Sequence, residues 1–365
     1  MTVRTLFIGM DGATFTVLND LTARTADGPV MPFLANIFED GTRAKLRSTP
    51  NPLTPPAWVS LMTGRSPGHH GVFDFIRAEE RADDVFFTLY DSRDCRVETI
   101  WSIASRQGLK VAALNFPFTA PPPKDLNGFM VPGFIPWRHL RRNSAPHDLY
   151  DRLKAIPDFD AKELAWDFEQ EKQAMEELTH EDRENWVKYH LPRERQWFRI
   201  ADHLLREEAP ELMAVMFDGV DKLQHQAWLY VDPKQQSGEL SEYHKRMRVL
   251  CLDYFRQLDG FIEKLVTAAG PRCRCSSPPT TASPPPPRSC ASTPTCTRRA
   301  TSSGRKCPTP TPAGAERRAC SPSSTGRTRW PIAARRRATA STSAWRAIPA
   351  RLASPRSSTR GCASV

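Results

Sequence analysis

The feature that most constrains this chain is a change of composition near residue 270. Residues 271–365 contain no Phe, Tyr, His, Asp, Asn, Gln or Met and are rich in Ser, Pro, Thr, Ala and Arg. A segment with so few large apolar side chains has little with which to build a core. We therefore expect one globular domain over 1–270 and a disordered basic tail over 271–365.

The charge divides at the same point. The whole chain has 51 Lys and Arg and 41 Asp and Glu, of which 18 and 1 lie in 271–365, leaving 33 and 40 in 1–270. The first part is therefore acidic, with a net charge of −7, and the tail is basic, with +17. A basic tail, densest at Arg335–Arg337, would suit anion or nucleic-acid binding through phosphates.

Cysteine usage and hydropathy exclude several classes of protein. Seven of the nine Cys lie in the tail without a CxxC pair or a nearby His, so we expect no zinc framework there. No signal peptide opens the sequence, and no apolar run is long enough to span a bilayer. We expect a cytoplasmic protein with no membrane partner.

Short apolar runs separated by helical segments predict an α/β fold. The runs cover 3–10, 109–117 and 211–217, and we expect helices over 97–108, within 160–208 and over 245–268. Strands that alternate with helices form a largely parallel sheet with helices on both faces. The regions near 77–108 and 138–195 are too long for simple connections, so we expect insertions or a cap there.

Polar residues follow the predicted strands at the carboxyl edge of the sheet, where open α/β sheets bind ligands. Asp11 ends the first strand in GMDG. Thr54 opens TPPAWVSLMTG, and we expect it to be the N-cap of a helix that ends at Gly64. A hydroxyl there would face the positive end of the helix dipole and free N–H groups, a setting that suits a phosphate.

A third polar cluster is the pair Asp221 and His225 in FDGVDKLQH. A spacing of four puts both side chains on one face of a helix, where they could share a cation such as zinc. Each cluster alone also has a structural explanation, namely a turn, a helix cap and an exposed acid–histidine pair. The three together carry the functional argument.

The stretches FIGMDG, TPPAWVSLMTGRSPGHHGVFDF and FDGVDKLQH, in this order, resemble the type I phosphodiesterase and nucleotide pyrophosphatase family of the alkaline phosphatase superfamily. The resemblance runs through about 1–270 and includes NGFMVPGF. It implies an alkaline-phosphatase-like sandwich and hydrolysis of a phosphoester or nucleotide-like small molecule. It also implies two Zn²⁺ ions, one held by Asp11 and Thr54 and one by Asp221 and His225.

The resemblance makes Thr54 the nucleophile of a double displacement at phosphorus. Two cations can hold the attacking and leaving oxygens, and metal coordination activates a threonine hydroxyl. His70 occupies the family's HG position, but we do not assign it as a ligand, and Phe75 stands where related pyrophosphatases carry an asparagine. Threonine in place of cysteine argues against a sulfatase, while another hydrolase or transferase of the superfamily stays an alternative.

After its last long helix the family continues with a strand ending in Ser-Asp-His-Gly that supplies further metal ligands, whereas this chain reads SSPPTTAS from Ser276. Codons for Ser277–Ser283, read one base earlier, permit Val-Ala-Ser-Asp-His-Gly-Phe. The same shift over Ala291–Ser302 permits a second family-like run. We infer a change of reading frame between about Ala269 and Ser276 that makes the tail an out-of-frame translation. A genuine basic linker is the alternative.

An out-of-frame tail has two structural consequences. The sheet loses a strand, so we expect a neighbouring strand to keep an open edge. Neither zinc site has a closed set of ligands. We therefore expect the chain as written to fold poorly and to be almost inactive.

Overall fold

The computed structural model describes residues 3–81, 84–164, 178–270, 273–276, 279–280 and 348–349. The first half contains β1 (Thr5–Asp11), α1 (Phe15–Leu21), α2 (Pro32–Asp40), α3 (Thr54–Thr63), α4 (Pro67–His70), β2 (Ile76–Arg81), β3 (Asp84–Leu89), η1 (Ser92–Asp94), α5 (Ile100–Arg106), β4 (Val111–Leu114), β5 (Gly128–Val131), α6 (Trp137–Asn143) and α7 (Leu149–Leu153). The second half contains α9 (His180–Glu207), β6 (Leu212–Phe217), α10 (Gly219–Val231), η2 (Pro233–Gln235), α11 (Glu242–Ala269), β7 (Arg274–Ser276), β8 (Pro279–Thr280) and β9 (Ile348–Pro349).

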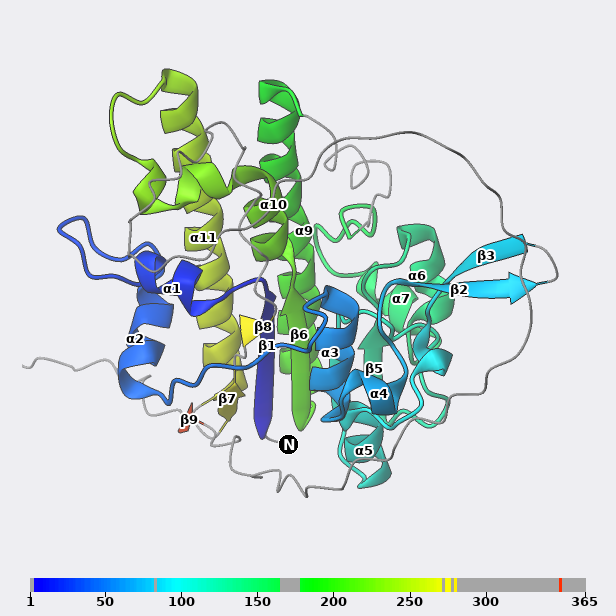
Figure 1. Cartoon of the computed structure of the whole chain (residues 1–365). Coiled ribbons are helices and arrows are strands. Elements are labelled where there is room, and N and C mark those ends of the chain that lie inside the picture. The colour runs from blue at the N-terminus through cyan, green and yellow to red at the C-terminus, as the bar shows by residue number, and fades with distance from the viewer. Residues whose placement is uncertain are drawn as a thin grey trace, which may run out of the picture. The chain divides into compact units, whose positions relative to one another are not determined.

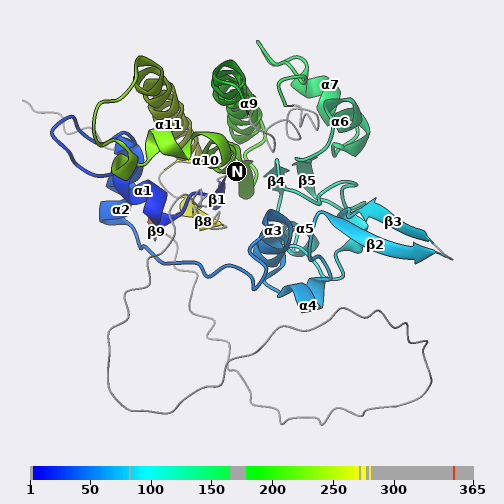
Figure 2. The same cartoon turned by 45° about the horizontal axis from the view of Figure 1, so that its top comes forward.

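The main sheet has the strand order β5-β4-β6-β1-β7-β9, and β8 also pairs with β1 (Figure 1). All these pairings are parallel except that of β7 with β9. Figure 2 shows α9, α10 and α11 on one side of this sheet and α3 and α5 on the other. The predicted largely parallel α/β sheet with helices on both faces is therefore confirmed.

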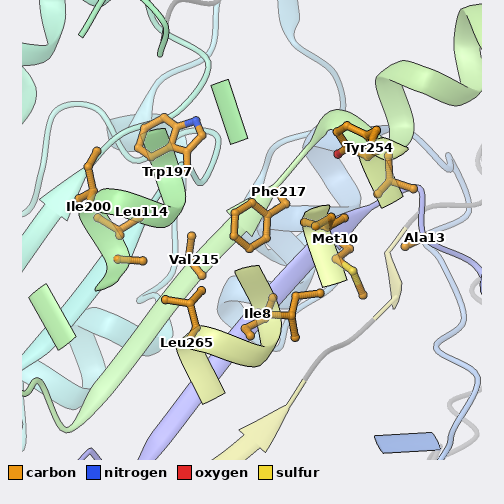
Figure 3. Close-up of a cluster of buried hydrophobic side chains, with 14 of the residues drawn as sticks. Ile8, Met10, Ala13, Leu114, Trp197, Ile200, Val215, Phe217, Tyr254 and Leu265 are labelled. Carbon is orange, nitrogen blue, oxygen red and sulfur yellow. The ribbon is translucent and has the colours of Figure 1, made fainter. Parts of the chain in front are cut away.

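Successive residues of the strands face two different apolar cores. In β6, Val215 and Phe217 belong to the core that α9, α10 and α11 cover, whereas Ala214 and Met216 belong to the core under α3 and α5. Figure 3 shows the first core, where Trp197 and Ile200 of α9 and Leu265 of α11 surround the strand residues. Because both faces are buried, the strands read as continuous apolar runs in the sequence.

The predicted elements correspond to observed ones. The three apolar runs form β1, β4 and β6. The predicted ranges 97–108 and 160–208 contain α5 and α9, and α11 extends beyond the predicted 245–268 at both ends. The region near 77–108 holds the antiparallel hairpin β2–β3, η1 and α5, and that near 138–195 holds α6, α7 and the first half of α9. Among the described residues, no helix combines the length and apolarity needed to cross a membrane.

The expectation that a strand next to the lost one keeps an open edge is wrong for β1. Thr5, Leu6 and Phe7 of β1 pair with β7, and Met10 and Asp11 pair with β8. Pairing needs only backbone N–H and C=O groups, so an edge strand accepts any chain that can extend beside it. Both short strands lie within the predicted tail. Most of that tail, including Arg335–Arg337, lies outside the described residues, and its disorder stays a prediction.

Candidate active site

The turn after β1 lies directly against the first turn of α10. Gly12 has φ +69°, and a Cβ atom there would come within 2.9 Å of the Asp221 Cα atom and 2.7 Å of the Gln224 side-chain nitrogen. Gln224 donates a hydrogen bond to the Gly12 carbonyl at 2.8 Å. Glycine at position 12 therefore permits the close approach of two segments that carry Asp11 and Asp221.

Thr54 contacts Asp11 and does not cap its helix. Leu53 is the N-cap, Thr54 is the first residue of α3, and no side chain caps this end. The Thr54 hydroxyl donates instead to the Asp11 carboxylate, with 3.3 Å between Oγ1 and Oδ2. The predicted N-cap role is wrong, whereas Gly64 ends the helix as predicted, with φ +64°.

The two prolines after Thr54 explain this difference. Pro55 and Pro56 have no backbone N–H, so the first turn lacks donors that a capping hydroxyl would normally bind. The Ala57 N–H is already bonded to the Leu53 carbonyl at 3.1 Å. The start of α3 therefore has fewer free backbone N–H groups for binding an anion than predicted. The Thr54 hydroxyl points toward Asp11.

Asp221 and His225 lie on one face of α10, as their spacing predicts. The His225 Nε2 atom is 3.2 Å from Asp221 Oδ2. The Asp221 side chain is 10% exposed and that of His225 is 57% exposed, so the pair runs from the protein interior to the solvent. The structure thus brings together two pairs, Asp11 with Thr54 and Asp221 with His225, and Asp221 lies against Gly12, the residue after Asp11.

These pairs supply the oxygen and nitrogen donors that zinc accepts. Within the described part of the chain, however, no group of three or more His, Cys, Asp or Glu is placed to hold a metal ion. A structural or catalytic zinc site takes at least three protein ligands. The residues present therefore fit part of a two-metal site and do not complete it.

His70 is a buried structural residue. Its Nδ1 atom accepts a hydrogen bond from the Val72 N–H at 3.1 Å, and its Nε2 atom bonds the Ser60 hydroxyl at 3.0 Å. Burial lowers the pKa of His70 below its usual range, which favours the neutral ring. Through one bond to Val72 and one to Ser60, His70 fixes the loop after α4 to α3.

A buried polar network holds the start of α10, and sequence reasoning missed it. Glu194 of α9 accepts hydrogen bonds from the Gly219 N–H at 2.6 Å and from the Tyr254 hydroxyl at 3.0 Å. Arg193 forms an ion pair with Asp218, the residue before α10. In the sequence, Arg193 and Glu194 are two more charges in a long charged helix, so no local signal marks them as buried.

The same network reaches the carboxyl end of β4. Asn115 donates from its side-chain nitrogen to the Met216 carbonyl at 2.9 Å and to Asp218 Oδ1 at 3.2 Å. Burial raises the pKa of Glu194 to about 8 and lowers the pKa of nearby His190 to about 3. These groups are neutral near pH 7, which limits the cost of burying them.

A surface cavity lies away from these residues. It has a volume of about 500 Å³ between the amino-terminal turns of α9 and α11, and His180, Lys188, Tyr243 and Arg246 are among its lining residues. Its lining includes none of the candidate site residues. The candidate site is therefore the group of polar side chains at the sheet edge, and this cavity is not part of it.

Solved structures that resemble the chain share little sequence with it. Phosphonoacetate hydrolase from Sinorhizobium meliloti, in complex with phosphonoacetate, is 17% identical with a TM-score of 0.42, and the match covers 71% of this chain and 54% of that one. Murine ectonucleotide pyrophosphatase / phosphodiesterase 5 is 15% identical with a TM-score of 0.44, covering 75% and 56%. The chain thus spans about half the length of the solved structures that it matches.

The sequence comparisons give a direct family assignment. No curated protein matches the chain. Residues 5–275, well over half of the chain, match the family model described as type I phosphodiesterase / nucleotide pyrophosphatase. This range contains all three sequence stretches on which the resemblance depends. The chain belongs to the type I phosphodiesterase / nucleotide pyrophosphatase family.

Proposed function

We propose that this chain derives from a metal-dependent phosphohydrolase, a phosphodiesterase or nucleotide pyrophosphatase, with Thr54 as its nucleophile. The observation that carries the proposal is the hydrogen bond between Thr54 and buried Asp11 at the end of β1. It holds a hydroxyl beside a carboxylate at the sheet edge where α/β folds bind ligands. The substrate would be a phosphoester or nucleotide-like small molecule in a cytoplasmic setting, with no specific nucleic acid and no membrane as partner.

The reaction consists of two displacements. The Thr54 hydroxyl releases its proton to solvent, and its oxygen forms a bond to phosphorus while the bond from phosphorus to the leaving oxygen breaks and that oxygen takes up a proton. Water then displaces Thr54 and releases the phosphate product. Asp11 orients the Thr54 hydroxyl for the first step through the observed hydrogen bond.

The proposed cofactors are two Zn²⁺ ions, with Asp11 and Thr54 as ligands of one and Asp221 and His225 as ligands of the other. Bound zinc would stabilise charge on phosphate oxygens and lower the pKa of a coordinated hydroxyl. Since the described residues leave both ligand sets incomplete, we assign no step to zinc in the chain as written. Activity is expected of a chain in which the reading frame is restored.

The strand register supports the frame proposal. Thr280 of β8 is the register partner of Asp11 in β1. Read one base earlier, codons 280 and 281 permit Asp and His. The restored residues would therefore enter the sheet edge beside Asp11, where ligands are missing.

The test compares the restored-frame protein with its Thr54→Ala variant, using an aryl phosphodiester. We expect hydrolysis that a chelator abolishes and zinc restores, and a fall of several orders of magnitude in the variant. Because Thr54 makes no capping bond, the free energy of unfolding should change by less than the roughly 1 kcal/mol of a lost N-cap. An active Thr54→Ala variant would contradict the nucleophile assignment.

A further inference from the structure

The hairpin of β2 and β3 exposes its apolar side chains. Ile76 is the register partner of Leu89, and Ala78 is that of Phe87. Residues two apart on a strand, and partners directly opposite each other, share one face of a sheet. Ile76 is 43% exposed, Leu89 65% and Phe87 71%, and Ala78 is also exposed. We call Ile76, Ala78, Phe87 and Leu89 the hairpin face.

The other face of the hairpin is polar and turns toward the protein. Arg77 forms an ion pair with Asp94 of η1, and its guanidinium carbon lies 5.6 Å from the centroid of the Tyr90 ring. Thr88, the register partner of Arg77, is half-buried. An antiparallel sheet with one solvated face normally turns its apolar side chains inward and its polar side chains outward. The ion pair of Arg77 therefore holds this hairpin in the reverse orientation.

The hairpin lacks the support that a two-stranded sheet needs. Figure 1 and Figure 2 both show β2 and β3 extending away from the main sheet. In the part of the chain that the structure describes, these two strands pair only with each other. A hairpin by itself is marginally stable in water, and packing against its apolar face stabilises it. The hairpin face is therefore suited to contact a second layer of structure.

Charge and size indicate which molecule supplies that layer. The four side chains of the hairpin face carry no charge, so two copies of this face can meet without bringing charged groups together. Residues 76–89 contain four acids and two Arg, which makes the hairpin unsuited to an anionic membrane surface. Two hairpin faces together would bury on the order of 600 Å² of surface. Interfaces below about 1,200 Å² are typical of weak, reversible complexes.

We propose that two copies of the chain associate reversibly through the hairpin face. The two hairpins stack face to face about a twofold axis, as packed sheets do, and each Phe87 ring leaves water by packing on the apolar side chains of the other copy. This inference does not depend on the proposed function. It also predicts a dimer that added salt does not weaken, because apolar contacts hold it together and the acids of the two hairpins repel each other.

Sedimentation velocity of the full chain across the micromolar range tests the proposal. We expect a monomer–dimer equilibrium that persists at high salt. Phe87→Glu and Phe87→Lys should each raise the dissociation constant at least about tenfold, because each places like charges across the twofold axis. An equimolar mixture of the two variants should recover dimers, because Glu then meets Lys. Since Phe87 is 71% exposed, neither substitution alters the core.

The matched control is Val249→Glu, which places the same charge on a side chain of α11 that is 65% exposed. It should leave the dissociation constant unchanged. A chain that stays monomeric throughout the concentration range would overturn the proposal. Association that salt weakens and that survives Phe87→Glu would come from the basic tail, and a mixture of variants that stays monomeric would exclude the face-to-face arrangement. Monomers that bind neutral lipid vesicles through Phe87 would assign the hairpin face to a membrane and overturn the proposal too.

Discussion

Glu194 and His190 show how burial changes the charge of single residues. Glu194 faces Asp218, Arg193, Gly219 and Tyr254, and burial raises its pKa to about 8 from 4.5. Between these values the folded chain binds a proton that the unfolded chain has released, so stability falls as pH rises. His190 faces Asp218, Asp221, Arg193 and Lys222, and its pKa of about 3 makes stability fall as pH drops below 6.5.

Between about pH 4.5 and 6.5 the effects of Glu194 and His190 on the free energy of unfolding cancel. Above pH 6.5 only the Glu194 effect remains. We predict that from pH 6.5 to 7.5 the unaltered chain loses roughly 1 kcal/mol of unfolding free energy relative to Glu194→Gln. Glutamine keeps an acceptor for Gly219 and Tyr254 but carries no proton to lose. Urea unfolding at both pH values measures this difference. Parallel pH profiles for the two proteins would contradict the burial effect.

At the scale of elements, the register of β8 on the edge of β1 sets the positions from which the missing metal ligands could reach Asp11. The pairing of Asp11 with Thr280 predicts that Thr280→Asp combined with Thr281→His strengthens zinc binding by the full chain. We expect at least a tenfold gain in affinity, because a direct ligand should contribute no less than an outer-shell partner, whose loss costs about 10–100-fold. Competition with a chromophoric chelator measures it, and no enzymatic activity is required.

The control adds Asp11→Asn to the same double variant and should remove most of the gain. The reversed pair, Thr280→His with Thr281→Asp, keeps the composition and changes only the order. Equal zinc affinity for the two orders would show that the gain comes from added ligands in general and not from the register with Asp11.

At the scale of the whole molecule, limited proteolysis tests where the folded part ends. In the sequence, Arg272 comes two residues before the start of β7 and Arg274 is the first residue of β7, and Arg288 is the next trypsin site along the chain. If β7 and β8 pair with β1 in solution, trypsin should first leave a fragment ending at Arg288. Mass spectrometry identifies the fragment. A first product ending at Arg272 or Arg274 would mean that these short strands do not hold.

The local pattern of the sequence was sufficient to predict several features. Apolar runs predicted β1, β4 and β6, because a strand buried on both faces needs apolar side chains throughout. The spacing of Asp221 and His225 predicted their 3.2 Å contact, because residues four apart meet on a helix. The family also followed from the sequence, because its motifs are short and continuous.

The tertiary structure decided what depends on segments far apart in the chain. Thr54 bonds Asp11, 43 residues away, because two prolines leave its hydroxyl no helix N–H to cap. Glu194 holds Gly219, 25 residues away, from the buried side of a helix that reads as charged throughout. The Phe75 ring lies 6.2 Å from that of Phe118 and 6.4 Å from that of Phe134, although no periodicity links these three loop residues. These contacts follow from how parallel strands align their carboxyl ends, which local sequence patterns do not encode.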